Sequence, residues 1–266
     1  MQPDWVPDGL DIDRPSVARI YDYLLGGSHN FAADRALARQ AIEAIPDLPV
    51  QAATNRAFMH RAVRFLVDAG VTQFLDLGSG IPTLGNVHEI AQAADPQARV
   101  AYVDIDDVAV IHSQHLLADN PNAIAVRGDL RRPAEILADA EVSGLLDLSR
   151  PVAVLAIAVL HAISDDDDPA GIIAALRDAL RPGSYLAMAH GVNTRVEDAD
   201  LVVDLSKRTT TPMTLRTPEQ VQRLFDGFDL VDPGLVWAPL WRPESPHEVP
   251  DRPERSGNLA GVGRKP

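Results

Sequence analysis

Short runs of apolar residues recur along the chain at the length of buried strands. Five of these runs lie at residues 72–77, 100–104, 123–126, 151–157 and 185–189. Segments of helical character separate them, and strands that alternate with helices predict a parallel sheet with helices on both faces. Two later runs, at residues 235–241 and 258–262, add a strand and a final strand that pairs back as a hairpin. The pattern predicts a doubly wound α/β fold with seven strands.

The first 70 residues carry a helical pattern instead. One apolar stripe at helical spacing consists of Val17, Ile20, Tyr21 and Leu24. Gly26-Gly27 ends this helix, Asn30 is the expected cap of a second helix that runs to about residue 45, and a third helix spans residues 50–69. We expect residues 1–69 to form a helical cap, packed on a main domain of residues 70–266 that binds the ligand.

A glycine-rich turn with a helix start directly after it follows the first strand. Gly78 and Gly80 allow a sharp turn and a close approach of the backbone to a ligand. A dinucleotide enzyme requires a third small residue at the position of Thr83, and Asp76 at the end of the strand would repel a pyrophosphate. A cofactor with an ammonium and a sulfonium would be attracted to Asp76. The turn therefore favours S-adenosylmethionine over NAD.

Carboxylates also end the next two predicted strands. Asp104 is placed to accept hydrogen bonds from both hydroxyls of an adenosine ribose. Asp129 is placed to bond the exocyclic amine of adenine, with Leu130 beside the ring. Each aspartate taken alone is equally consistent with a helix cap or a turn residue. The glycine turn between Asp76 and Asp104 favours the cofactor.

The predicted cap holds polar side chains that either solvate its surface or close over the methionine end of the cofactor and line a substrate cavity. They are Tyr21, Tyr23, His29, Asn30, Asp34, Asn55 and Arg56. Together with the strand ends, they give a set of candidate cofactor-binding residues. This set is Tyr21, Gly27, Arg56, Asp76, Gly78, Ser79, Gly80, Asp104, Ile105, Asp129, Leu130 and Ala158.

Composition narrows the classes of function. The chain has 266 residues and a formal net charge of −14, which repels polyanions and argues against a nucleic-acid partner. It has no cysteine, which excludes disulfides, cysteine nucleophiles and thiolate metal sites and fits a reducing compartment. We find no apolar stretch of membrane-spanning length and no signal-peptide pattern. We therefore expect a cytoplasmic protein with no membrane partner.

The acidic run at residues 164–168 has two interpretations. Hard cations bind carboxylate oxygens, so the run invites a metal hypothesis. However, it lacks the spaced ligands and the turn glycine of a calcium loop, and Pro169 follows it at the position typical of a first helical residue. We interpret the run as a helix start and predict no metal site.

Several motifs together resemble class I S-adenosylmethionine-dependent methyltransferases. In chain order they are Leu75-Asp76-Leu77-Gly78-Ser79-Gly80, Val103-Asp104, Gly128-Asp129, Val159-Leu160-His161 and Leu180-Arg181-Pro182-Gly183. Residues 15–27, 30–31, 34–35, 55–58 and 261–266 are similar to one bacterial family of S-adenosyl methyltransferases, long described only as a domain of unknown function. One departure is Pro82, where many class I motifs carry a third glycine.

The resemblance implies a Rossmann-like sheet of seven strands with its last strand antiparallel. It also implies that S-adenosylmethionine is the cofactor and S-adenosylhomocysteine the product, and it gives cofactor roles to Asp76, Gly78, Gly80, Asp104 and Asp129. It leaves the methyl acceptor, the methylated atom and the oligomeric state open.

The chemistry that follows is methyl transfer, which depends mainly on positioning and desolvation. His161 and His190, near the ends of the fourth and fifth predicted strands, are candidate general bases or structural residues. The fourth strand does not end in the Asp/Asn-Pro-Pro-Tyr motif of enzymes that methylate nucleobase amines.

The working hypothesis is a methyltransferase that acts on a small molecule under the cap. The alternatives are a non-catalytic sensor or partner protein that binds the cofactor, and then an NAD-dependent oxidoreductase.

Overall fold

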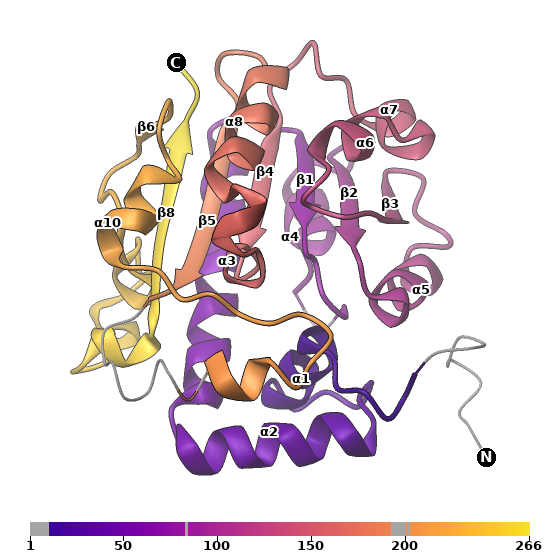
Figure 1. The fold of residues 1–266 in the computed structure, drawn as a ribbon. Helices are drawn as coiled ribbons and strands as arrows, with labels where there is room; N and C mark the ends of the chain where they lie inside the picture. The colour runs from indigo at the N-terminus through magenta and orange to yellow at the C-terminus, as the bar shows by residue number, and fades with distance from the viewer. Residues whose placement is uncertain (1–10, 83–84, 193–200, 202) are drawn as a thin grey trace.

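The computed structural model describes residues 11–82, 85–192, 201 and 203–266 of the chain. It contains an eight-stranded sheet with helices on both faces (Figure 1). The strands are β1 Gln73–Leu77, β2 Arg99–Asp104, β3 Ala123–Arg127, β4 Ala153–Ile157, β5 Tyr185–Gly191, β6 Asp229–Leu230, β7 Val236–Trp237 and β8 Asn258–Arg264. Their spatial order is β3-β2-β1-β4-β5-β8-β6, and β7 pairs with β8 off this path.

The strands from β1 to β5 are parallel, and β8 runs antiparallel to β5. This confirms the predicted α/β class and the antiparallel last strand. The register pairs Asp76 with Tyr102 and Leu77 with Val103, so the ends of β1 and β2 lie at one edge of the sheet. Ligands bind at this carboxyl edge in open α/β sheets.

Two apolar layers cover the sheet. One face packs against α6 Pro133–Ala138, α7 Ala140–Leu145, α8 Pro169–Ala179 and α10 Pro218–Arg223. The other face packs against α3 Leu48–Asp68 and α4 Val87–Ala94, while α5 Asp107–Leu116 flanks β2 and β3. Fully buried strands such as β4, with the sequence Ala-Val-Leu-Ala-Ile, are apolar on both sides because both faces are covered.

The remaining helices of the N-terminal segment, α1 Val17–Leu24 and α2 Ala32–Ala44, lie across the carboxyl edge of the sheet. Figure 1 shows both helices beneath the lower end of the strands. The helix α3 differs from them, because Phe58, Ala62 and Leu66 enter the core of one sheet face. The helix α3 is therefore part of the helical layer that covers the sheet. The boundary at residue 69 between a cap and a main domain stays a prediction.

Two predicted helix starts are wrong. The second helix begins at Ala32 with Phe31 as its cap, because the Asp34 carboxylate accepts the Phe31 N–H at 2.8 Å. The Asn30 side chain donates to Asp22 at 2.7 Å instead. The helix after the glycine turn, α4, begins only at Val87, because the Glu89 carboxylate accepts the N–H groups of Gly85 and Asn86 and forms a local cap. Thr83, the residue that argued against NAD, lies outside the described residues.

The C-terminal strands also differ from the prediction. The run expected at residues 235–241 gives only the two-residue strand β7, followed by the 3-10 helix η3 Ala238–Leu240. Pro239 has no N–H for a strand ladder and restricts the residue before it, which explains the early end. The short strand β6 brings the count to eight.

The other turns of the 3-10 type are η1 Leu160–Ala162, η2 Asp165–Asp167, η4 Pro246–Glu248 and η5 Pro253–Ser256. The acidic run does precede a helix, since Asp168 caps α8 by accepting the Gly171 N–H at 3.0 Å. The predicted cap of α10 is confirmed too, with Thr217 and Gln220 forming a capping box.

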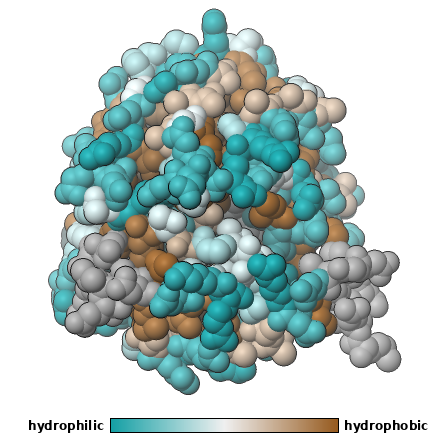
Figure 2. Space-filling view, in the orientation of Figure 1, coloured by the Kyte–Doolittle hydropathy of each residue, from teal (hydrophilic) through white to brown (hydrophobic). Residues whose placement is uncertain are grey.

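The surface seen in Figure 2 is mainly hydrophilic, with apolar residues in small separate patches.

Candidate functional site

A continuous cavity of about 940 Å³ lies between the carboxyl edge of the sheet and the N-terminal helices. Its walls come from four parts of the chain: the ends of β1, β2, β3 and β4; helices α1 and α3; residues 210–215; and residues 252–258. Small-molecule sites span about 300–1,000 Å³, so this cavity is large enough to be shared by a cofactor and a second small molecule.

The glycine turn forms one end of the cavity. Gly78 has φ +65° and donates its N–H to Val103 at 2.8 Å, which fixes the turn against β2. A Cβ at Gly78 would lie 2.1 Å from a methyl group of Val159, so a larger residue cannot fit. Gly80 has φ +67° with open space where a Cβ would stand, so the backbone is exposed to the cavity. Ser79 lines the cavity between them.

Two buried carboxylates line the cavity beside this turn. Asp104 accepts the N–H groups of Gly80 at 2.7 Å and Asp106 at 2.9 Å. Burial raises the pKa of Asp104 to about 6, against the lowering effect of these two hydrogen bonds. Burial also raises the pKa of Asp76 to about 7, while the Arg56 guanidinium lowers it and the nearby Asp104 carboxylate raises it. A cationic or hydrogen-bond-donating ligand would favour the charged form of both groups.

The ends of β3 and β4 complete the sheet-edge wall. Asp129 lines the cavity and is paired with Arg131, whose Nη2 lies 2.6 Å from Oδ2, and this bond lowers the pKa of Asp129. Leu130 is buried beside it, and Ile105 is exposed. Ala158 has φ +56°, a conformation that costs energy for a residue with a Cβ and that clusters at functional sites.

Helix α1 turns its apolar stripe toward the cavity. The stripe consists of Val17, Ile20, Tyr21 and Leu24, and all four residues line the cavity. The buried residues of the same helix are the charged Arg19 and Asp22. An apolar stripe normally packs against the protein core. Here it forms a wall of the cavity, which makes that wall suited to an apolar ligand.

Charged groups hold α1 in this orientation. Arg19 donates Nε to the fully buried Asp34 at 2.9 Å and lies 3.5 Å from the Asp106 carboxylate. Ser16 donates its hydroxyl to Asp106 and its N–H to Asp34 at 2.9 Å. Asp106 also caps α5, two residues after Asp104. The network therefore ties the N-terminal helices to the sheet edge beside Asp104.

Of the three N-terminal residues predicted to bind the cofactor, two line the cavity and one does not. Arg56 lines the cavity, donates to the Asn86 side chain at 3.0 Å, and lies close enough to Asp76 to affect its pKa. Tyr21 lines the cavity with its hydroxyl 3.0 Å from the Ala52 carbonyl. Gly27 does not line the cavity, in contrast to our prediction.

The absence of a side chain at Gly27 has a different cause. A Cβ at this position would lie 1.9 Å from the Asp22 carboxylate. Asp22 itself accepts the His29 N–H at 2.9 Å and a hydrogen bond from Asn30, so it holds the turn after α1. Gly27 is therefore explained by the packing of this turn.

The two candidate histidines have different surroundings. His161 lines the cavity, and its Nδ1 accepts the Gly191 N–H at a long distance of 3.4 Å. Burial and the Arg216 guanidinium lower the pKa of His161 to about 4, so the ring is neutral near pH 7. An N–H can only donate, and the proton of the neutral ring is therefore on Nε2.

His190 is fully buried, 0% exposed, and lies outside the cavity lining. Its Nδ1 donates to the Gly191 carbonyl at 2.7 Å, and its Nε2 accepts from Arg216 at 2.9 Å. Burial lowers its pKa to about 3. With both nitrogens engaged inside the protein, His190 has no free position for a substrate proton. This geometry does not support the predicted role of His190 as a base.

Sequence reasoning missed one wall of the cavity. Residues 210–215 lie beside the cavity, and the Thr214 N–H donates to the His161 carbonyl at 2.6 Å. The next residue, Arg216, is 2% exposed and donates to the carbonyls of Leu160 and Ile163. Arg216 thereby fixes the loop that carries His161. The segment has no recognisable motif, so no local signal in the sequence marked it.

No group of three or more His, Asp or Glu side chains within the described ranges is arranged to hold a metal ion. Asp165 of the acidic run pairs with Arg216 at 2.8 Å, and Asp167 accepts the Ser164 hydroxyl at 2.8 Å. These contacts, with the cap that Asp168 provides, give the acidic run a structural role. Within the same ranges, none of the helices combines the length and apolar character needed to cross a membrane.

Comparisons with known proteins agree with this geometry. A family model described as S-adenosyl methyltransferase matches residues 3–266. A crystal structure of a candidate methyltransferase from Thermobifida fusca YX is 44% identical, covers 99% of both chains and superposes with a TM-score of 0.93. A DUF574 family protein from Streptomyces avermitilis MA-4680 is 40% identical, covers 96% of this chain and 100% of its own, and gives a TM-score of 0.91.

A more distant likeness concerns the fold alone. A chain of the complex between the Haloferax volcanii Trm112 methyltransferase activator and its methyltransferase partner is 16% identical, with 81% of this chain and 93% of that chain covered and a TM-score of 0.51. A search of curated proteins finds no match.

Proposed function

The chain belongs to the S-adenosyl methyltransferase family, and we propose that it transfers a methyl group from S-adenosylmethionine to a small, mainly apolar acceptor bound under α1. The observation that carries the proposal is that one cavity joins two different walls. The ionisable side chains of Asp76 and Asp104 line one wall, and the apolar stripe of α1 lines the other.

The sheet-edge wall fits the cofactor. The buried carboxylates of Asp76 and Asp104 offer acceptors for an ammonium group and for ribose hydroxyls. Gly78, Ser79 and Gly80 give the backbone access to the ligand, and the strained Ala158, directly after β4, lines the same cavity. In the proposal, Ile105 and Leu130 flank the adenine, and the Asp129 carboxylate accepts a hydrogen bond from the exocyclic amine of adenine. Arg56 and Tyr21 lie toward the methionine end of the cofactor.

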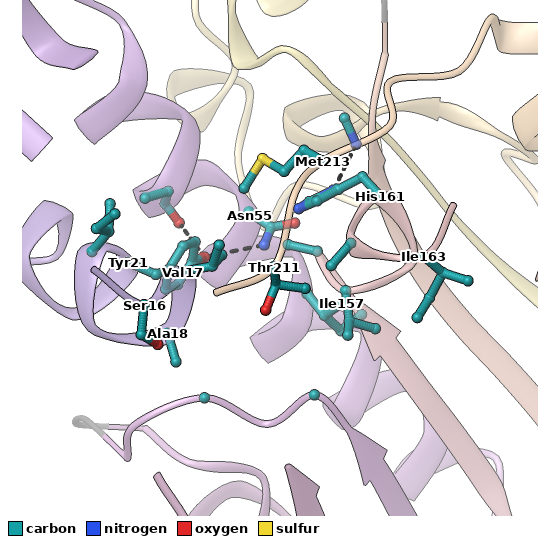
Figure 3. Close-up of a pocket in the computed structure, with 18 of the residues that line it drawn as sticks. Ser16, Val17, Ala18, Tyr21, Asn55, Ile157, His161, Ile163, Thr211 and Met213 are labelled. Carbon is teal, nitrogen blue, oxygen red and sulfur yellow. Dashed lines mark hydrogen bonds between the residues drawn. The ribbon is translucent and has the colours of Figure 1, made fainter. Parts of the chain in front are cut away.

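The opposite wall fits an acceptor with little charge. Beyond the stripe of α1, further apolar residues line the same cavity from α3, from the end of β4 and the loop after it, and from the segment after β5. They include Ala52, Met59, Ile157, Ile163 and Met213. The last three are labelled in Figure 3. Figure 3 shows Val17 and Tyr21 on one side and Ile157 and Ile163 on the other. A neutral acceptor would bury apolar surface against these residues.

The residues act mainly by positioning. When bound, S-adenosylmethionine supplies a sulfonium-linked methyl group that a nucleophile displaces in line, leaving S-adenosylhomocysteine. The two walls hold the reactants on opposite sides of one cavity, and such positioning can supply several kcal/mol of the rate enhancement. His161 faces the cavity from the loop after β4, where it can contact the acceptor. A role for His161 as general base requires its proton to move from Nε2 to Nδ1, so we propose that it orients the acceptor.

The alternative of a sensor that only binds the cofactor requires no second compartment. The cavity continues past the carboxylates to the apolar wall, and this continuity favours a catalyst. No described feature of the sheet edge favours the sensor.

Formation of S-adenosylhomocysteine tests the proposal. The protein is incubated with saturating S-adenosylmethionine and a panel of small neutral hydroxyl, amine and carbon acceptors, and the product is measured by mass spectrometry. We expect acceptor-dependent product with the wild type and none with Asp104→Ala. Asp119→Ala, an exposed aspartate outside the cavity, is the matched control. Turnover of an unstructured RNA but of no small acceptor would contradict the proposal.

A further inference from the structure

The side chain of Asn55, on α3, has a fixed orientation. Its Nδ2 donates to the Tyr21 hydroxyl at 3.1 Å, and that hydroxyl lies 3.0 Å from the Ala52 carbonyl. A carbonyl can only accept, so the single proton of the Tyr21 hydroxyl goes to Ala52. The hydroxyl must therefore accept from Asn55, which places the Asn55 amide nitrogen toward Tyr21 and the oxygen Oδ1 away from it.

This oxygen lacks a hydrogen-bond partner. Asn55 is 2% exposed, and its Oδ1 is shielded from solvent and accepts no hydrogen bond. A buried acceptor without a donor destabilises a protein, and most buried polar atoms are paired for that reason. Asn55 lines the cavity, and Figure 3 shows its side chain between Tyr21 and His161. The described protein atoms offer this acceptor no donor.

The neighbouring His161 offers the complementary group. Because Nδ1 accepts the Gly191 N–H, the proton of the neutral ring is on Nε2. In Figure 3, His161 and Asn55 extend toward each other from opposite sides of the cavity. The wall thus presents an acceptor at Asn55 and a donor at His161.

We propose that Asn55 Oδ1 and His161 Nε2–H bind a neutral hydroxyl group of the acceptor molecule, and that Asn55 determines specificity for it. A hydroxyl oxygen can satisfy both groups at once, because it donates its proton to Asn55 Oδ1 and accepts the proton of His161 Nε2–H. The proposal rests on the proposed function, whose apolar acceptor would carry this hydroxyl. Where a site is built to pair with a hydroxyl, an analogue without the donor leaves the buried acceptor unpaired and is rejected.

A consequence for stability separates this role from a structural one. Asn55→Leu removes the unpaired oxygen and keeps a similar volume, while the Tyr21 hydroxyl keeps its bond to Ala52. Removal of the unpaired acceptor offsets the loss of the one hydrogen bond from Nδ2 to Tyr21, because an unpaired buried acceptor costs more than a typical hydrogen bond contributes. We expect the Tm of ligand-free Asn55→Leu to equal or exceed that of the wild type. A side chain needed to hold Tyr21 would instead lower the Tm when replaced.

The binding experiment uses a matched pair of probes, 2-naphthol and 2-methoxynaphthalene. Both fit an apolar cavity and both can accept from His161, but the ether cannot donate to Asn55. Each probe is titrated into the S-adenosylhomocysteine-saturated protein and into the protein alone, with ligand-observed NMR as the readout. We expect the wild type to bind the naphthol about fivefold more tightly than the ether. Asn55→Leu should lose this preference.

Control variants make every outcome informative. Thr54→Val, on the same helix but outside the cavity lining, should keep the preference. His161→Ala should weaken the binding of both probes and leave the ratio of their dissociation constants unchanged. Equal binding of the two probes by the wild type, binding of neither, or a preserved preference in both Asn55→Leu and Asn55→Ala would overturn the assignment. Failure of S-adenosylhomocysteine to bind is seen in the same titration and counts against the proposed function, while the ratio of the probes still tests Asn55.

Discussion

The two walls of the cavity use charge in opposite ways. On the N-terminal side, Arg19, Asp34 and Asp106 satisfy one another within the protein and leave the apolar stripe of α1 to face the cavity. On the sheet side, Asp76 and Asp104 are buried at the cavity with their pKa values raised to about 7 and about 6. Charge on the first side builds the wall, whereas charge on the second side is available to a ligand.

This difference shows which polar residues are structural and which are functional. A charged group whose partners are all in the protein is needed for folding. A buried carboxylate whose pKa is raised destabilises the folded state when it ionises, and it persists where a ligand repays that cost. The comparison therefore predicts opposite effects on stability for substitutions in the two walls.

The largest expected effect is on the N-terminal side. Arg19→Met leaves the fully buried Asp34 without its guanidinium, and breaking a buried ion pair costs about 3–5 kcal/mol of unfolding free energy. Chemical denaturation measures the loss. Arg39→Met, at an exposed position of α2, is the control and should change stability by less than about 0.5 kcal/mol. Equal effects of the two variants would show that the network does not hold the wall.

The sheet side should respond in the opposite direction. Asp76→Asn removes the charge that burial disfavours, so the ligand-free protein should gain about 2–4 °C in Tm at pH 8 for each kcal/mol by which the charge destabilises it. The same variant should bind S-adenosylmethionine about 30-fold more weakly, because a hydrogen bond to a charged group is lost. Differential scanning calorimetry and titration calorimetry measure the two changes. A lower Tm for Asp76→Asn would contradict the comparison.

The two histidines sharpen the comparison on a smaller scale. His190→Ala removes an acceptor from the buried Arg216 and a donor from the Gly191 carbonyl, so we expect a loss of about 1–3 kcal/mol of stability. His161→Ala removes only a long hydrogen bond to Gly191 among those described, and should change stability by less than about 1 kcal/mol. Urea denaturation distinguishes the two. Similar losses would place both histidines in the structural group.

The pH dependence of cofactor binding tests the sheet-edge wall without a substitution. In the proposed site, cofactor binding favours ionised Asp76, whose pKa in the ligand-free protein is about 7. Affinity should therefore rise with pH up to about 7 and level off above it, with binding at pH 5.5 more than about tenfold weaker than at pH 8. Asp76→Asn should reduce this dependence, leaving the contribution of Asp104. A wild-type affinity that is constant over this range would show that Asp76 does not sense the ligand.

Local patterns predicted most of the fold. The apolar runs predicted where β1 to β5 lie along the chain, and the capping box at Thr217 and Gln220 predicted the start of α10. Errors arose where another side-chain contact replaced the expected helix start. Asn30 bonds Asp22 rather than capping α2, and Glu89 delays the start of α4 by capping it at Gly85 and Asn86.

The site was predictable to the extent that it depends on strand ends. Asp76 and Asp104 follow apolar strands on either side of a glycine turn, and the sheet brings them into one cavity. The roles of Asn55 and His190 depend on Tyr21 and Arg216, which are distant in sequence, and no spacing rule predicts such pairs. The wall at residues 210–215 is placed by contacts of the segment with the loop after β4, such as the bond from Thr214 to His161.

Titration calorimetry with S-adenosylhomocysteine tests the central claim most directly, because it requires no knowledge of the acceptor. The wild type and Asp119→Ala should bind equally, and Asp104→Ala should bind at least about 30-fold more weakly while keeping its folded structure. Binding that is unchanged by Asp104→Ala, or NAD binding in place of S-adenosylhomocysteine, would contradict the assignment of the sheet-edge wall to this cofactor.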